Sequence, residues 1–211
     1  MSHFTVGVIT KIPTKNSIDK ALAPFQENNM GDCPKKYLKF YPNEDAEFDE
    51  EMNQKGYWEN PNRKWDWYSI GGRWDGGIPL IDGKYANQSI ISKINIGIVQ
   101  KEYEEAIRFW DVVVEGHELK PGEEKSDFPS FLSGEYYKNQ FGDREAYAID
   151  QSSFATFAIV TPEGEWIEKG EMGWFGINSA TAESRKDYSS KFIDVLKKYP
   201  DYFFTLVDCH I

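Results

Sequence analysis

The sequence contains little of the residue types that build the commonest metal and disulfide sites. Its 211 residues include only 2 cysteines and 3 histidines. Cys33 and Cys209 lie far apart in the chain, so no Cys-x-x-Cys pair is present. This pattern rules out the common zinc spacings and argues against a disulfide framework. We therefore expect neither a bound metal nor a cofactor.

Positive charge is also in short supply. The chain carries 24 Lys and Arg against 35 Asp and Glu, which gives a net charge of −11. Such a field repels a polyanion, so we exclude extended nucleic acid as a partner. A small phosphate-bearing ligand remains compatible with the charge, because salt screens distant acids and a few local cations dominate at short range.

No apolar run approaches the length of a membrane span, and residues 1–15 lack a basic region and a small-residue cleavage site. We expect a cytoplasmic protein without a membrane partner. The length suits one domain with its own core, and no repeat or low-complexity linker divides the chain. The prediction is a single α+β domain over residues 1–211.

The order of strand and helix signals predicts the fold class. β-branched and aromatic runs predict strands, and apolar residues at helical spacing predict helices. At both ends of the chain these signals alternate, and together they predict an α+β fold with a mixed or antiparallel sheet, a ferredoxin-like core with long insertions. The predicted strands are residues 4–10, 37–41, 64–70, 154–161, 165–169 and 202–209, and the predicted helices are residues 16–22, 101–115, 130–141 and 186–198.

Aromatic residues are abundant, and the most informative group lies in residues 60–77, NPNRKWDWYSIGGRWDGG. Strand alternation places Trp65 and Trp67 on one face. The Gly-Gly turn exposes backbone N–H groups that can hold an anion, and neighbouring Arg and Lys add fixed positive charge. The glycine patterns of Walker and dinucleotide-binding loops are absent. The candidate ligand-binding residues here are Arg63, Lys64, Trp65, Trp67, Tyr68, Gly71, Gly72, Arg73 and Trp74.

An alternative stays open for this segment. It would be a tight hairpin whose Trp side chains pack in the core and whose Arg73 pairs with an acid.

A second candidate segment is residues 169–178, KGEMGWFGIN. It combines Glu171 with glycine turns and the aromatic pair Trp174 and Phe175, and a glycine-flanked Trp in a loop suits ring stacking. The alternative is a loop anchored by a buried Trp. We expect residues 171–175 and the hairpin of residues 65–74 to face one shared pocket, with Arg73 or Lys64 turned into it.

The C-terminal residues 208–211 contribute a third candidate. On a strand, Asp208 and His210 share a face and Cys209 points the other way, so a Cys-His dyad is geometrically poor. An Asp-His pair could orient an imidazole for ligand binding or, with His3, form a partial metal site if the first and last strands are neighbours. Two histidines and one aspartate are a thin ligand set, so His210 is assigned to ligand binding.

Residues 44–51, EDAEFDEE, are almost wholly acidic. We expect this run to be exposed and to make no contribution to small-ligand binding. Its functional alternatives are a cation site and a surface that mimics nucleic acid and binds a host protein.

Taken together, these segments resemble a family of uncharacterised phage, prophage and bacterial proteins. Members open with MSHFTV, carry NPN-x-KWDWY-x-IGGRW and GEMGW-x-G, and end in VDCHI. The chain matches at residues 1–6, 60–74, 170–176 and 207–211. It departs from the pattern in having Arg63 and Ser69 at variable positions and Phe175 where many relatives have Trp.

The resemblance implies a phage accessory gene and no particular mechanism. Because phages that meet nucleotide-signalling immunity often encode small proteins against the signal, we expect a non-enzymatic protein that sequesters a nucleotide-derived signal, such as a cyclic ADP-ribose-like species or a cyclic dinucleotide. One alternative is an acidic inhibitor of a host factor. The other is a hydrolase or lyase that uses His210 or Glu171 as base, with Arg73 on the phosphate. Self-association is left open.

Overall fold

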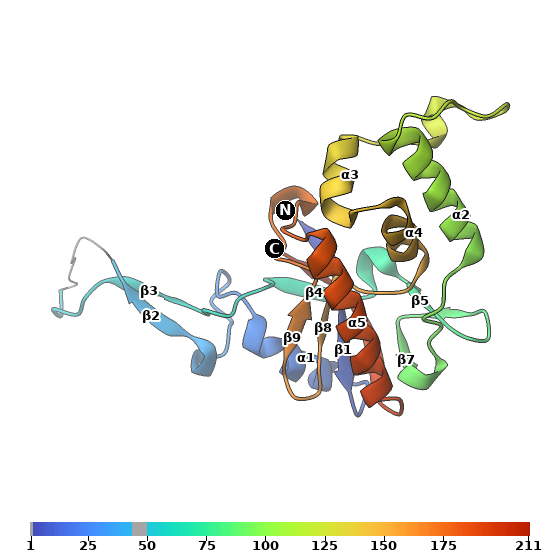
Figure 1. The fold of residues 1–211 in the computed structure, drawn as a ribbon. Helices are drawn as coiled ribbons and strands as arrows, with labels where there is room; N and C mark the ends of the chain where they lie inside the picture. The colour runs from blue at the N-terminus through green and yellow to red at the C-terminus, as the bar shows by residue number, and fades with distance from the viewer. Residues whose placement is uncertain (1, 44–49) are drawn as a thin grey trace.

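The structure is a computed structural model that describes residues 2–43 and 50–211, with only the backbone described at Trp174. Its centre is a mixed six-stranded sheet in the order β4-β10-β1-β8-β9, with β7 also paired to β10 (Figure 1). The strands are β1 (His3–Thr10), β4 (Trp67–Ile70), β7 (Gln88–Ile90), β8 (Ala158–Val160), β9 (Trp166–Glu168) and β10 (Phe203–His210). The first and last strands pair antiparallel along their whole length, which confirms that they are neighbours.

The α+β class and the mixed sheet are confirmed, but the ferredoxin-like core is not. In the split βαβ arrangement of that core, another strand separates the two parallel strands. Here β8 lies directly beside β1 and runs parallel to it, and β9 takes the edge. Burial agrees with this order, because β8 is buried at every residue and β9 only partly. Sequence patterns indicate the order of elements along the chain, which does not determine their order in the sheet.

Strand alternation divides the core between the two faces of the sheet. On one face Val6, Val207 and Cys209 pack with α1 (Lys15–Leu22). On the other, Phe204 and Leu206 pack with α5 (Ala182–Lys198). Thr14 caps the start of α1 by accepting a hydrogen bond from the backbone N–H of Ser17. Both helices bury their apolar stripes on the sheet, which places the core in two layers.

A separate helical group lies beside the sheet (Figure 1). It contains α2 (Gln100–Phe109), α3 (Gly134–Phe141) and α4 (Arg144–Ser152), which bury Trp110 and Tyr147 between them. A π-helical turn, η5 (Trp110–Val114), extends α2, so the predicted helix over residues 101–115 is nearly matched. α3 starts later than the predicted residue 130 because Ser133 is its N-cap and accepts a hydrogen bond from the backbone N–H of Tyr136.

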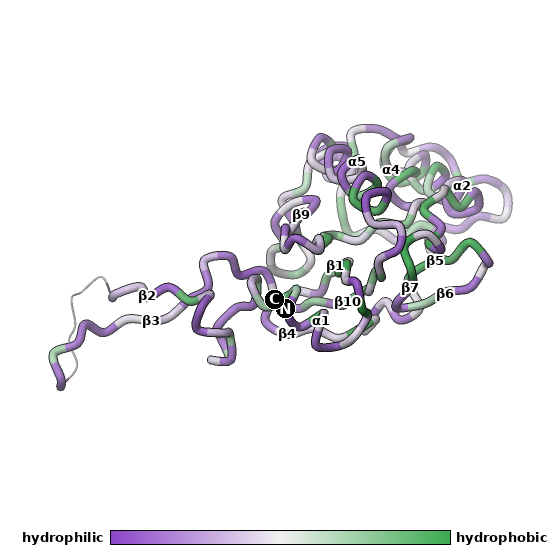
Figure 2. The backbone as a smooth tube through the Cα atoms, turned by 90° about the horizontal axis from the view of Figure 1, so that it is seen from below, coloured by the Kyte–Doolittle hydropathy of each residue, from purple (hydrophilic) through white to green (hydrophobic). Residues whose placement is uncertain are grey.

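A two-stranded ribbon, β2 (Lys39–Pro42) and β3 (Gly56–Glu59), projects from the body (Figure 1). Hydrophobic segments gather in the body, and the ribbon is mainly hydrophilic (Figure 2). The acidic run predicted to be exposed falls largely at residues 44–49, outside the described residues; Glu50 and Glu51 are exposed.

The remaining elements are short. They are β5 (Ile78–Pro79), β6 (Tyr85–Ala86), and the 3-10 turns η1 (Ala23–Phe25), η2 (Lys35–Tyr37), η3 (Gly72–Trp74), η4 (Ile91–Lys93), η6 (Lys125–Asp127) and η7 (Trp174–Gly176). Among the described residues, none of the helices combines the length and apolar character that crossing a membrane requires.

Candidate functional site

The segments that carry the sequence motifs meet at one end of the sheet. Pairing of β1 with β10 sets His3 opposite His210. Pairing of β10 with β4 sets Trp67 opposite His210 and Ser69 opposite Asp208. The second segment joins them through Ser2, whose hydroxyl donates to the Gly173 carbonyl at 2.7 Å and accepts the Gly176 N–H at 2.9 Å.

Two Asp-His pairs form at this end. His3 Nδ1 lies 2.8 Å from Asp208 Oδ1, and His210 Nδ1 lies 2.7 Å from Asp66 Oδ1. Asp66 also accepts the Trp67 N–H at 2.7 Å and an amide N–H of Asn29 at 3.2 Å. All four paired side chains are nearly buried, and a buried carboxylate needs hydrogen bonds of this kind to offset its desolvation.

The carboxylate of Asp208 lies against the Gly71-Gly72 turn, so an anion of the protein itself occupies the place where the sequence predicts a ligand anion. The backbone N–H of Arg73 donates to Asp208 Oδ2 at 3.0 Å. A Cβ at Gly72 would lie 2.4 Å from the same carboxylate, so the close approach requires glycine. The turn is therefore not free to hold a phosphate, and the Arg73 and Trp74 side chains are exposed beside it.

Trp67 covers the pair of histidines. Its ring stacks on His210 with centroids 5.0 Å apart and planes 20° apart, and it meets His3 edge-on at 5.2 Å. The two imidazoles are themselves 5.0 Å apart. Trp67 remains 46% exposed, so it forms the outer wall of this group.

Trp65 belongs to the core and not to a ligand site, which corrects the sequence interpretation, and Tyr68 is partly buried against the same core. Trp65 is 6% exposed, and its Nε1 donates to the Leu22 carbonyl at 3.1 Å. The predicted alternation fails because β4 begins only at Trp67. The Tyr68 hydroxyl donates to Asp19 of α1, and burial and this hydrogen bond raise the pKa of Tyr68.

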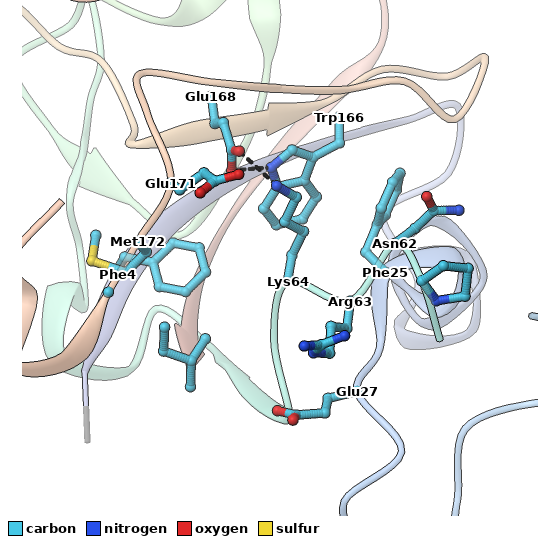
Figure 3. Close-up of a pocket in the computed structure, with 13 residues that line it drawn as sticks. Phe4, Phe25, Glu27, Asn62, Arg63, Lys64, Trp166, Glu168, Glu171 and Met172 are labelled. Carbon is cyan, nitrogen blue, oxygen red and sulfur yellow. Dashed lines mark hydrogen bonds and ion pairs between the residues drawn. The ribbon is translucent and has the colours of Figure 1, made fainter. Parts of the chain in front are cut away.

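A cleft of about 820 Å³ lies at the same strand ends, and Figure 3 shows the residues that line it. It opens on the face of the sheet opposite to the pair of histidines. Phe4 and Ile211 line it, and they are the chain neighbours of His3 and His210. Because successive strand residues point to opposite faces, the cleft and the histidine pair lie back to back. The lining residues are Phe4, Phe25, Glu27, Pro61, Asn62, Arg63, Lys64, Trp166, Glu168, Glu171, Met172, Gly173 and Ile211.

The cleft combines aromatic rings with charges of both signs. Phe25 and Trp166 form one wall, with ring centroids 5.0 Å apart. Glu168 receives a hydrogen bond from Trp166 Nε1 at 2.7 Å and an ion pair from Lys64 Nζ at 2.7 Å (Figure 3). Arg63 pairs with Glu59 at 2.7 Å. Each cation of the cleft therefore already has a carboxylate partner.

The expected shared pocket forms with only some of its expected residues. Arg63 and Lys64 line the cleft together with Glu171. Of the two cations expected to turn into it, Lys64 lines the cleft and Arg73 does not. Trp67 and His210 do not line it either. Phe175 is exposed and does not line the cleft. The side chain of Trp174 lies outside the described part of the chain, so its stacking role stays a prediction.

The sequence patterns do not predict the two aromatic rings that form the wall of the cleft. Phe25 and Trp166 come from segments without a motif, and backbone hydrogen bonds between residues 25–27 and residues 64–65 hold Phe25 beside Lys64. Fully buried Asn60 anchors this loop by donating to the carbonyls of Pro24 and Gln26 at 2.8 and 2.9 Å. The sequence signal at this place is the Asn60-Pro61 dipeptide, which indicates a turn, and only the structure shows that Asn60 is buried.

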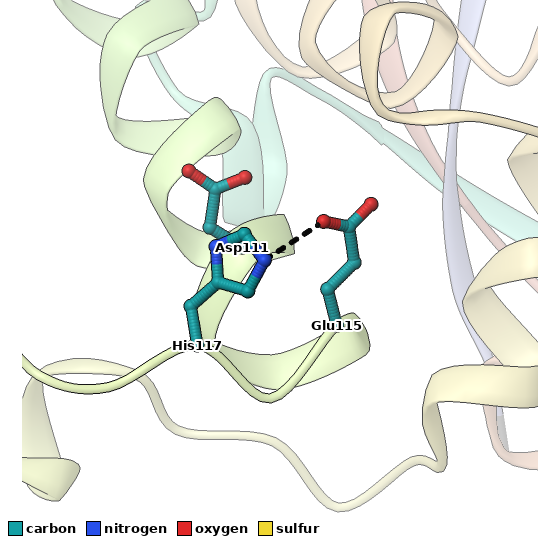
Figure 4. Close-up of side chains that lie close together, drawn as sticks. All are labelled: Asp111, Glu115 and His117. Carbon is teal, nitrogen blue, oxygen red and sulfur yellow. Dashed lines mark ion pairs between the residues drawn. The ribbon is translucent and has the colours of Figure 1, made fainter.

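Among the described residues, one group brings three potential metal-ligating side chains together. Asp111, Glu115 and His117 place ligand atoms within 4.8 Å of one another, next to η5 (Figure 4). His117 Nε2 lies 3.3 Å from Glu115, and Arg144 donates to Asp111 at 3.1 Å. Two of the three are exposed, and Arg144 supplies positive charge to Asp111, so surface polar contacts account for the group.

A nearly buried charged group joins α4, α5 and the residue that follows β9. Asp150 pairs with Lys169 at 3.1 Å and with Arg185 at 3.5 Å. Burial lowers the pKa of Lys169, Asp150 opposes that shift, and Arg185 adds to it.

No protein-family model matches the chain, and comparison with curated proteins and with solved structures gives no match. The family resemblance therefore remains a prediction from the motifs.

Proposed function

We propose that the protein binds and sequesters a small nucleotide-derived signal in the cleft between residues 61–64 and residues 171–173. The signal is a cyclic ADP-ribose-like species or a cyclic dinucleotide, and the setting is the cytoplasm of a bacterial cell infected by a phage that carries the gene. This is binding without catalysis.

The composition of the cleft is the observation that carries the proposal. Its volume falls in the range of about 300–1,000 Å³ that small-molecule sites occupy. Phe25 and Trp166 offer flat faces for a base, Arg63 and Lys64 offer donors for a phosphate, and Glu171 offers acceptors for ribose hydroxyls. These groups are the complement of a nucleotide.

The existing ion pairs limit which ligands fit. A phosphate that binds Arg63 or Lys64 must replace or share Glu59 or Glu168. Three carboxylates, Glu27, Glu168 and Glu171, also line the cleft. Both features disfavour a highly charged ligand, so the cleft suits a molecule with one or two phosphates and several neutral polar groups.

The deciding experiment separates binding from catalysis. The protein is incubated with cyclic ADP-ribose or with a cyclic dinucleotide, free ligand is measured, and the protein is then denatured by heat. Depletion followed by release of the intact molecule supports sequestration. Release of an altered molecule supports the hydrolase or lyase alternative, and absence of depletion with every nucleotide tested contradicts the proposal.

One observation favours a second candidate function, binding to a host protein. Tyr57 and Trp58 of the projecting ribbon are each more than half exposed. An isolated two-stranded ribbon is marginally stable, and exposed aromatic rings are enriched at interfaces. The double variant Tyr57→Ser, Trp58→Ser tests this, because it should lose its effect in infected cells while its cleft binds ligand normally.

A further inference from the structure

The chain holds three histidines, and two of them lie against each other. His3 and His210 are direct cross-strand partners. The flanking residues Ser2 and Ile211 exchange both backbone hydrogen bonds, so His3 and His210 occupy the adjacent non-hydrogen-bonded position, where side chains come closest. This placement brings two imidazoles together on rigid strands.

Each imidazole uses one nitrogen and leaves the other available. Both Nδ1 atoms contact a carboxylate, Asp208 for His3 and Asp66 for His210. Within residues 2–43 and 50–211, no hydrogen bond reaches either Nε2, and neither atom is among the buried polar atoms left without a partner. A carboxylate on Nδ1 fixes the tautomer that presents a lone pair at Nε2.

The spacing of the rings suits a shared ion. With metal–nitrogen distances of about 2.1 Å, two imidazoles on one tetrahedral ion have centroids roughly 5 Å apart. The observed separation is 5.0 Å. Trp67 stacks on the face of His210, which leaves the edge of that ring, where the lone pair lies, uncovered by the stacking contact.

We propose that His3 and His210 bind one divalent transition-metal ion of the zinc class through their Nε2 atoms. Asp208 and Asp66 are positioning residues that hold the rings. Imidazole nitrogen selects zinc-class ions over magnesium and calcium, which take oxygen ligands. The remaining coordination positions accept water or an anionic group of a ligand. Because the cleft lies on the opposite face of the strands, this site stands apart from the proposed nucleotide site.

The test is titration with Zn²⁺ by calorimetry and with Co²⁺ by visible absorption, on the full chain in chelator-free buffer. We expect one ion per chain and a Co²⁺ spectrum of low coordination number. His3→Asn and His210→Asn should each weaken binding at least about tenfold, because Asn keeps a donor for the aspartate but cannot supply Nε2. Asp66→Asn should weaken it by about 10–100-fold.

His117→Asn is the matched control, since it removes the third histidine and disrupts the group of Asp111, Glu115 and His117. It should leave binding unchanged. Absence of Zn²⁺ binding, or loss of binding in the His117 variant alone, overturns the proposal.

A second measurement covers variants that do not fold. In the wild-type protein, Zn²⁺ should shift the imidazole NMR signals of His3 and His210 and leave that of His117 in place; the His117→Asn spectrum assigns the third signal. Zn²⁺ shifts confined to His117 overturn the proposal as well.

Discussion

Gly72 lies against the carboxylate of Asp208 so closely that any side chain at position 72 would collide with it. A Cβ would stand 2.4 Å from Asp208 Oδ2, and Gly72 has a φ of +54°. The same carboxylate accepts the Arg73 N–H and contacts His3 Nδ1. Gly72 therefore determines how the turn after β4 closes over the first Asp-His pair.

Gly72→Ala should lower the free energy of unfolding by more than the about 1–3 kcal/mol that backbone strain alone costs. Gly83→Ala is the control, because Gly83 also has a positive φ, +82°, and no atom lies within 4 Å of the place where its Cβ would stand. Urea unfolding of both variants isolates the effect of the close approach. Equal losses would show that Asp208 moves aside at no cost.

Trp65 and Trp67 should lose very different amounts of stability on truncation although they stand two residues apart. Trp65→Ala removes a buried ring and should cost about 3–5 kcal/mol of stability. Trp67→Ala removes a half-exposed ring and should cost about 0.5–1.5 kcal/mol, the range of an aromatic pair. Chemical denaturation of both variants measures the difference, and a Trp67 variant as unstable as the Trp65 variant would contradict the difference in burial between the two rings.

These two tryptophans also show how far sequence patterns reach. The elements with strong periodicity, such as β1, β10 and α5, are predicted close to their observed bounds. Trp65 is misplaced because residues 64–65 pair with residues 25–27 and not with β10, a long-range contact that strand alternation does not encode. The ferredoxin-like core is not confirmed, because β8 and not β9 pairs with β1, and strand patterns do not encode this choice of neighbour either.

The candidate site shows a different limit. The Gly-Gly turn is predicted to hold a ligand anion with its backbone N–H groups, but the anion beside it is Asp208, which lies 135 residues after Arg73 in the chain and accepts the Arg73 N–H. Local chemistry indicates what a turn can bind, and only the fold shows whether the protein already supplies it. Conversely, the proximity of His3 and His210 follows from one topological expectation, that the chain ends are adjacent strands, and this expectation is confirmed.

Lys169 should make stability rise with pH in the alkaline range. Burial lowers the pKa of Lys169 in the folded state below its usual value of 10.5. Between the lowered pKa and 10.5 the unfolded chain binds more protons than the folded one, so this group increases stability as pH rises through that window. Lys169→Met leaves Asp150 paired with Arg185 and should remove this increase. The difference between wild-type and variant unfolding free energies, measured at several pH values, cancels the common ionisation of tyrosines; a constant difference would contradict the prediction.

Arg63 and Trp166 should contribute to ligand affinity through separate contacts in the cleft. Arg63→Gln removes a charged donor and should weaken nucleotide binding by about 1.5–3 kcal/mol. Trp166→Ala removes a stacking face and should weaken it by about 1–3 kcal/mol. Lys186→Gln, on α5 and away from the cleft lining, is the charge-matched control for Arg63→Gln. Calorimetric titration with the nucleotide that the depletion assay identifies measures all three.

Because Arg63 is exposed and paired with Glu59 at the surface, its variant should melt like the wild type, so a loss of affinity there reports on the ligand contact and not on folding. Unchanged affinity in both cleft variants would remove the cleft as the nucleotide site, whatever the histidine pair binds on the opposite face.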